Sequence, residues 1–267
     1  MNYALKVLLK EPYRLLKETN GRKFLSLCMR LSNKKRHEKM SVRFYDQEIQ
    51  LADTWSFLWQ FHDIFFRKVY DFKSQSDHPL IIDCGTNIGV SVIRFKKLFP
   101  KAEIIGFEPD SEIFQIACNN LKAFENVTLH NKAVWEHSNG VLFSTNEADT
   151  GRVDGDKGFR VESIRLKELL DTYQSIDFLK LDIEGGEFVV IEDCAESLRH
   201  VKFIFIEIHT FKDQEQKISR IIQILEKAGF RYYIENENVQ PKPFLDRWKI
   251  TSSGMDVQLN MYAINNQ

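Results

Sequence analysis

Apolar and polar positions alternate in blocks along the chain from residue 80 onward, and each block has the length of a strand or a helix. Short apolar runs predict buried strands, and segments with apolar residues every three or four positions predict helices. Because strands and helices alternate, the pattern predicts an α/β three-layer sandwich with right-handed crossovers and a mainly parallel seven-stranded sheet. Strands are expected at 80–84, 102–107, 126–130, 177–183, 201–208, 230–235 and 257–264, and helices at 89–99, 111–123, 186–198 and 213–229.

The residues before this region have a different pattern, which predicts helices and one short strand or hairpin. We therefore expect an N-terminal helical region in residues 1–76 and a main domain in residues 77–267. The N-terminal elements are helices at 3–18 and 21–32 with a break at Asn20-Gly21, a strand or hairpin at 41–51, and an aromatic helix at 53–70.

An insertion at 136–175 separates the third and fourth predicted strands. Its pieces 140–144 and 159–164 are expected to pair as a hairpin, and the glycine-rich part between them is either a mobile lid or a passive surface loop. We expect the pocket that selects an acceptor to come from this insertion, the N-terminal helices and residues 236–255.

Composition excludes several classes of protein. Hydrophobic residues at 43% and charged residues at 28% exclude a disordered chain. The four cysteines are far apart in sequence, without a C-x-x-C pair, which argues against a zinc site and a disulfide scaffold. No run approaches the roughly 18 apolar residues of a membrane span. We expect a cytoplasmic protein without a nucleic-acid partner.

The charge is unevenly distributed along the chain. Residues 1–40 hold eleven Lys or Arg and three Glu, a net charge of +8, so the remainder carries −9 of the total of −1. The basic segment is either a solvated loop or a contact with anionic lipid headgroups or an acidic acceptor. Homodimer formation through its leucine faces is another explanation.

The most informative run is Asp83-Cys84-Gly85-Thr86-Asn87-Ile88-Gly89, which follows the first predicted strand. A strand, a glycine turn and a helix open a nucleotide-binding sheet, and Gly85 and Gly89 are expected to leave space for a ligand beside the backbone. The dinucleotide fingerprint has two further glycines where this chain has Asn87 and Val90, so a nucleoside without a phosphate bridge fits better. Glu108 ends the second strand, where a carboxylate accepts hydrogen bonds from ribose hydroxyls.

Together these motifs resemble a class I S-adenosylmethionine-dependent methyltransferase with a Rossmann-like fold. Two further stretches resemble the FkbM family within that class: residues 127–135, and residues 179–187 with the pattern Asp-x-Glu-Gly-x-Glu. Glu207-Ile208-His209 also fits the family's pattern. The resemblance implies an O-methyltransferase that acts on a sugar, a polysaccharide or a related natural product.

The resemblance also implies roles for individual residues. Asp83, Gly85 and Gly89 would face the methionine end of S-adenosylmethionine, Asn87 would line its amino-acid part, and Glu108 would hold the ribose. Asn131 to Ala133 would lie near the adenine, with a turn role as the alternative for Asn131.

Methylation of a hydroxyl also needs a group that accepts the proton. Three arrangements stay open: Asp182 as the base, His209 as the base oriented by Glu207, or a divalent metal shared by Asp182, Glu184, Glu207 and His209. The metal is the least favoured of the three. Glu187 is expected to do no more than begin a helix favourably. Two other functions stay open, an NAD(P)-dependent oxidoreductase and a non-catalytic nucleoside-binding module.

Overall fold

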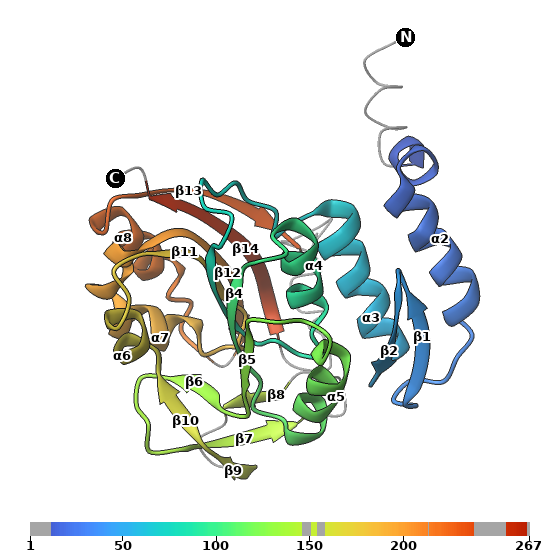
Figure 1. The fold of residues 1–267 in the computed structure, drawn as a ribbon. Coiled ribbons are helices and arrows are strands. Elements are labelled where there is room, and N and C mark those ends of the chain that lie inside the picture. Colours follow the sequence, from blue (N-terminus) through green and yellow to red (C-terminus); the bar gives the residue numbers. More distant parts are fainter. Residues whose placement is uncertain (1–11, 146–150, 154–157, 213, 238–254, 266–267) are drawn as a thin grey trace, which may run out of the picture.

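The computed structural model describes residues 12–145, 151–153, 158–212, 214–237 and 255–265. They form the predicted Rossmann-like three-layer arrangement around one seven-stranded sheet (Figure 1). The strand order is β13-β14-β12-β11-β3-β4-β5, and only β14 runs antiparallel to its neighbours within this sheet. The strands are β3 (Leu80–Cys84), β4 (Glu103–Phe107), β5 (Val127–His130), β11 (Ile176–Leu181), β12 (Val201–Phe211), β13 (Phe230–Asn236) and β14 (Met255–Asn265).

Helices cover both faces of the sheet. One face packs against α4 (Val90–Leu98) and α5 (Ser111–Leu121), and the other packs against α6 (Leu166–Asp171), α7 (Glu187–Cys194) and α8 (Ile218–Lys227). Strand β3 is buried over its whole length, because Ile81 joins the core on the face of α4 and α5 while Leu80 and Ile82 join the core on the face of α6, α7 and α8. A 3₁₀ turn, η2 (Ser197–His200), leads into β12.

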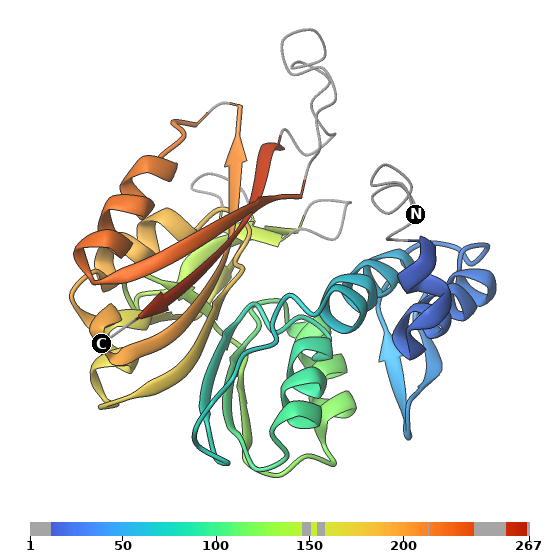
Figure 2. The ribbon, with the colours of Figure 1, turned by 90° about the horizontal axis from the view of Figure 1, so that it is seen from above.

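The N-terminal elements lie at one end of the molecule, beside α4 and α5 (Figure 2). They share the core of that face, with α2 and the hairpin packed around the aromatic side chains of α3. The hairpin forms as predicted, and the aromatic helix continues into a π-helix, a rare form that is frequent at functional sites. These elements are α2 (Thr19–Leu31), β1 (Met40–Phe44), β2 (Gln47–Leu51), α3 (Thr54–Phe61) and the π-helix η1 (His62–Arg67).

The predicted helix break at Asn20-Gly21 is wrong. Residues 12–17 are helical, the break falls at Glu18, and α2 begins at Thr19. Gly21 is buried inside α2, where an added Cβ would lie 2.5 Å from the carbonyl oxygen of Leu15. The glycine therefore permits a close backbone approach instead of ending a helix.

The insertion contains the predicted hairpin and two further strands, β8 (Gly151–Val153) and β10 (Ser163–Arg165), and a third short strand, β6 (Ala133–Trp135), comes directly before it. β7 (Val141–Thr145) pairs with β9 (Phe159–Val161), as expected, and also with β8. β6 and β10 form a separate parallel pair. Most of the glycine-rich part between β7 and β9, and residues 238–254 of the expected acceptor region, lie outside the described residues. Among the helices described, none has both the length and the apolar character that crossing a membrane requires.

Candidate active site

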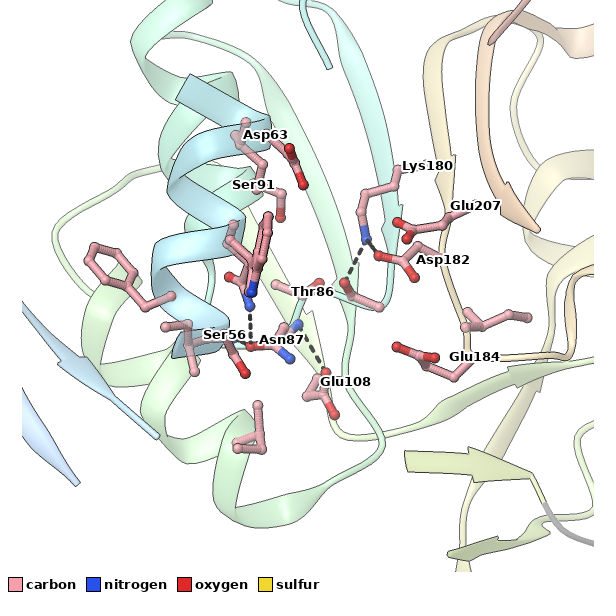
Figure 3. Close-up of a pocket in the computed structure, with 18 of the residues that line it drawn as sticks. Ser56, Asp63, Thr86, Asn87, Ser91, Glu108, Lys180, Asp182, Glu184 and Glu207 are labelled. Atoms are coloured by element: carbon pink, nitrogen blue, oxygen red, sulfur yellow. Dashed lines mark hydrogen bonds and ion pairs between the residues drawn. The ribbon is translucent and has the colours of Figure 1, made fainter. Parts of the chain in front are cut away.

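A cavity with a volume of about 1070 Å³ opens at the carboxyl ends of β3, β4 and β11 and beside β12. Figure 3 shows Asn87 and Glu108 beside α3 on one side of it, and Lys180, Asp182, Glu184 and Glu207 on the other. Parallel strands end at the same edge of a sheet, which is why residues so far apart in sequence line one space.

The glycine turn has the positive φ angles that favour glycine, +87° at Gly85 and +92° at Gly89. Its glycines, however, make room for protein atoms. A Cβ at Gly85 would collide with the carbonyl oxygen of Asp182, and one at Gly89 would lie 2.9 Å from the Leu121 side chain. Both glycines therefore permit close packing, between β3 and β11 at Gly85 and against α5 at Gly89, and Gly85 also lines the cavity.

Asp83 lies beneath the turn and is fully buried. Its Oδ2 accepts a hydrogen bond from the Ser91 hydroxyl at 2.5 Å, and its Oδ1 lies 3.4 Å from Lys180 Nζ without hydrogen-bond geometry. Burial raises the pKa of Asp83, and the charge of Lys180 opposes that rise. The carboxylate is thus held by α4 and β11 as well as by its own strand.

Glu108 lies at the end of β4 and is 8% exposed. Its two carboxylate oxygens accept hydrogen bonds from the backbone N–H groups of Asn87 and Asp110, both at 2.9 Å. Burial raises the pKa of Glu108 to about 7, although these backbone donors lower it. Asp110 also caps α5 by accepting from Glu112 and Ile113, as helix N-caps do.

Asn87 and Asn131 both stabilise the backbone around Glu108. Asn87 has a φ of +51°, and its Oδ1 accepts hydrogen bonds from its neighbour Ile88 and from Gln60 on α3. Asn131 is exposed, and its amide donates to the carbonyl oxygens of Glu108 and Pro109. Asn131 thus has the turn role that the sequence left open as the alternative, whereas Ala133 lines the cavity.

The acidic side of the cavity is formed by Asp182 and Glu184 after β11 and by Glu207 on β12. His209 lies behind them and is 6% exposed. Its Nε2 is 3.5 Å from Glu184 and 3.7 Å from Glu207, while its Nδ1 is 3.0 Å from Glu187. Glu184 has a φ of +58°, a strained conformation for a residue with a side chain.

Glu187, not Glu207, is therefore the nearest partner of His209. Glu187 is 1% exposed, and it also accepts hydrogen bonds from the backbone N–H groups of Ile183 and Gly185. The expectation that Glu187 only begins α7 is wrong, because its carboxylate joins the β11–α7 turn to the imidazole on β12. Gln258 on β14 donates a hydrogen bond to Glu207.

The charges in this cluster change its chemistry. Burial would lower the pKa of His209, but the charges of Glu184, Glu187 and Glu207 outweigh burial and raise it well above 6.5. Burial, followed by the charge of Asp182, raises the pKa of Glu207, and burial also raises that of Glu184. An imidazole that keeps its proton is a poor base, whereas a carboxylate whose pKa is raised towards the working pH is a stronger base in its ionised form.

A divalent metal has one set of possible ligands among the described residues. One ligand atom each from Asp182, Glu207 and His209 lies within 4.8 Å of the other two. Carboxylate and imidazole are chemically suitable ligands. The distances among these atoms are compatible with a shared ion and equally with a hydrogen-bonded charge cluster.

Sequence reasoning assigned no role to Lys180, although a signal was present. β11 is otherwise apolar at its buried centre, so a lysine inside a strand that is buried at every position requires a charged partner. Gln60 and Arg67 were missed because the aromatic pattern of 53–70 indicated only packing. Arg67 pairs with Glu237 at 2.6 Å and with Glu235 at 2.8 Å, which links η1 to the end of β13 beside the cavity.

The known proteins that this chain is similar to include methyltransferases. Methyltransferase sdnD of Sordaria araneosa is 27% identical over a match that covers 51% of this chain and 68% of that protein. The 2-O-methyltransferase NoeI of Sinorhizobium fredii (strain NBRC 101917 / NGR234) is 28% identical, with coverage of 51% and 65%. The crystal structure of methyltransferase FkbM from Methylobacillus flagellatus KT is 16% identical, covers 91% of this chain and 59% of that one, and has a TM-score of 0.46.

The family model of the methyltransferase FkbM domain matches residues 83–232, which is more than half of the 267 residues. The matched range includes the cavity residues from Gly85 to Glu207. The chain therefore belongs to the FkbM methyltransferase family.

Proposed function

We propose that this protein is an S-adenosylmethionine-dependent O-methyltransferase that acts on a hydroxyl of a sugar, a polysaccharide or a related natural product. The observation that carries the proposal is the division of one cavity into two sides. Glu108 and the glycine turn form the side suited to a nucleoside, and Asp182 and Glu207 form a side suited to taking a proton. The name of the relative NoeI, a 2-O-methyltransferase, supports oxygen as the acceptor atom.

The residues of the first side fit S-adenosylmethionine, which supplies an electrophilic methyl group on a sulfonium when it is bound. Each oxygen of Glu108 accepts one backbone N–H group, and a carboxylate oxygen has capacity for a second donor such as a ribose hydroxyl. Gly85 and Asn87 line the cavity and would contact the methionine end, and Ala133 would lie near the adenine, whereas Asp83 and Gly89 lie outside the lining and would act by shaping the turn. The cavity volume also accommodates an acceptor.

The second side would take the acceptor's proton. In methyl transfer the carbon–sulfur bond breaks with its electrons remaining on sulfur, the carbon–oxygen bond forms, and the hydroxyl loses its proton. We assign that proton to Glu207, because it lines the cavity and burial beside Asp182 raises its pKa. His209 would act through Glu207 as a positioning residue, since the imidazole is 3.7 Å behind that carboxylate and is held by Glu187.

Calorimetric titration tests the donor assignment without knowledge of the acceptor. We expect S-adenosylhomocysteine to bind with a micromolar dissociation constant, typical of a substrate-sized ligand at about −8 kcal/mol, and NAD not to bind. A transfer assay with labelled S-adenosylmethionine over a panel of glycans would then test the acceptor class. Binding of NAD in place of S-adenosylhomocysteine would reject the proposal, and binding without transfer to any hydroxyl would favour a non-catalytic module.

The pKa of Glu108 predicts a pH-dependent donor affinity. Because burial raises that pKa to about 7, the carboxylate gains a proton as the pH falls through neutrality and then loses acceptor capacity for ribose hydroxyls. The dissociation constant of S-adenosylhomocysteine should rise about tenfold from about pH 8 to about pH 6. In Glu108→Gln the affinity should be low and nearly constant over this range. An unchanged slope in that variant would assign the effect to another group.

The location and partners of the protein are further proposals. The four cysteines are free thiols in the structure, which supports a reducing compartment such as the cytoplasm. Contact of the basic N-terminus with a membrane and homodimer formation stay predictions of the sequence.

A further inference from the structure

Lys180 is a buried lysine that lies between the two sides of the cavity. It is 2% exposed and sits near the end of β11, the central strand beside β3. Its Nζ lines the same cavity as Asp182 and the glycine turn (Figure 3). A lysine is rarely buried so completely without compensating charges, so its partners indicate its purpose.

The ammonium group of Lys180 joins both sides. It donates to the carbonyl oxygen of Gly85 at 2.7 Å, and it pairs with the Asp182 carboxylate at 3.1 Å and with that of Asp83 at 3.4 Å. Lys180 and Asp182 are two residues apart on an extended segment, so their side chains lie on the same face. The backbone N–H of Asp182 also donates to the carbonyl oxygen of Cys84 at 3.1 Å.

The positive charge of Lys180 is fixed. Burial would lower its pKa, but the charges of Asp182 and Asp83 outweigh burial and raise it. Other titratable groups near Nζ include Glu207, whose charge also raises this pKa, and Tyr70, whose ring centre is 5.7 Å away. The charge of Lys180 in turn lowers the pKa values of Glu108 and Glu184. Lys180 therefore carries its positive charge at neutral pH.

We propose that Lys180 is a positioning residue of the methyl-donor site. Its ammonium group holds the Gly85 carbonyl and the Asp182 carboxylate in one arrangement, and its charge favours the neutral thioether product over the cationic donor. This inference rests on the proposed function, since it requires S-adenosylmethionine as the donor. Methyl transfer removes the positive charge from sulfur, so a nearby fixed cation is less unfavourable to the transition state than to the bound donor. Asp83 and Asp182 limit this repulsion, which lets the donor bind.

The test compares the dissociation constants of S-adenosylmethionine and S-adenosylhomocysteine, two ligands that differ by the methyl group and one charge. In Lys180→Met, we expect both ligands to bind more weakly, because the Gly85 carbonyl loses its donor. The dissociation constant of S-adenosylhomocysteine divided by that of S-adenosylmethionine should nevertheless rise about threefold or more. The reason is that two carboxylates are left without their cation, which favours the positively charged ligand, S-adenosylmethionine. A purely structural role would weaken both ligands equally and leave this ratio unchanged.

Lys96 provides the matched control. Lys96 lies on α4, is 4% exposed and is not among the residues that line the cavity. Its ammonium group donates a hydrogen bond to the carbonyl oxygen of Ala102 at 2.5 Å. Lys96→Met also removes a buried ammonium group, so it should lower the melting temperature while the ratio stays at the value of the unaltered protein. A ratio shift in Lys96→Met as large as in Lys180→Met would overturn the proposal.

Asp182→Asn keeps the inference testable if Lys180→Met does not fold. The asparagine side-chain oxygen still accepts from Lys180, but the cation is then less neutralised, so the ratio should fall about threefold or more. The double variant Lys180→Met/Asp182→Asn removes one charge of each sign and should return the ratio to within about twofold of its original value. An unchanged ratio in Asp182→Asn would overturn the role of this charge pair.

Failure of the unaltered protein to bind either ligand would reject the proposed function, whereas normal binding with an unchanged ratio in the variants rejects only this inference.

Discussion

Replacement of Glu207 by Gln is expected to lower methyl transfer about 100- to 10,000-fold, the usual contribution of a positioned general base. Gln has nearly the same shape, and its amide oxygen can still accept the hydrogen bond from Gln258. What is lost is the carboxylate that lines the cavity and takes the acceptor's proton. Initial rates at saturating donor, together with calorimetric binding of S-adenosylhomocysteine, separate this chemical loss from any loss of affinity.

His209→Gln and Glu192→Gln serve as comparisons for Glu207→Gln. Because His209 would act through Glu207, its replacement should cost less activity and should shift the pH profile. Glu192 on α7 forms an ion pair of 2.6 Å with Arg220 and is not among the residues that line the cavity. Its replacement should therefore leave the rate unchanged. A larger loss in His209→Gln than in Glu207→Gln would make the imidazole the base.

The metal arrangement has a separate test, because EDTA removes a divalent ion without altering the chain. With Glu207 as the base, turnover should survive dialysis against EDTA. Loss of turnover with EDTA and its recovery with added Mg²⁺ or Mn²⁺ would assign Asp182, Glu207 and His209 to an ion.

Much of the fold could be predicted because buried parallel strands are nearly continuous apolar runs. β3 and β11 are buried at every position, so their sequences could be identified without any knowledge of their neighbours. Gly21 was misread because a glycine that breaks a helix and one that lets two backbones approach look alike in sequence. β6 and β10 have three residues each, too few for any period to be visible.

The members of the site were easier to predict than their pairing. Asp182 follows β11 and Glu207 lies within the adjacent strand β12, one residue after the partner of Leu181, so the parallel pairing brings them together. The partner of His209 depends on where the β11–α7 turn aims Glu187, and the proton affinity of His209 depends on three carboxylates from different segments. Neither property is encoded locally, which explains why Glu187 was undervalued and the imidazole was considered as a base.

Gly85→Ala is expected to cost about 3 kcal/mol of folding stability or more, since it combines backbone strain with overpacking. The φ of +87° is unfavourable for alanine, and the added Cβ would collide with the Asp182 carbonyl oxygen, a backbone atom that cannot rotate away. Relief requires β3 and β11 to separate at their carboxyl ends. The Gly85 carbonyl would then leave Lys180, so we expect donor affinity to fall at least about tenfold in whatever protein remains folded.

Gly229→Ala isolates the strain contribution, because Gly229 has the same φ of +87° and follows α8 away from the cavity. It should lower the free energy of unfolding by about 1 kcal/mol and leave the binding of S-adenosylhomocysteine unchanged. Urea unfolding measures the first quantity and calorimetry the second. If Gly85→Ala bound the ligand as tightly as Gly229→Ala does, the contact between the glycine turn and Asp182 would not position the donor, and the two sides of the cavity would be independent of each other.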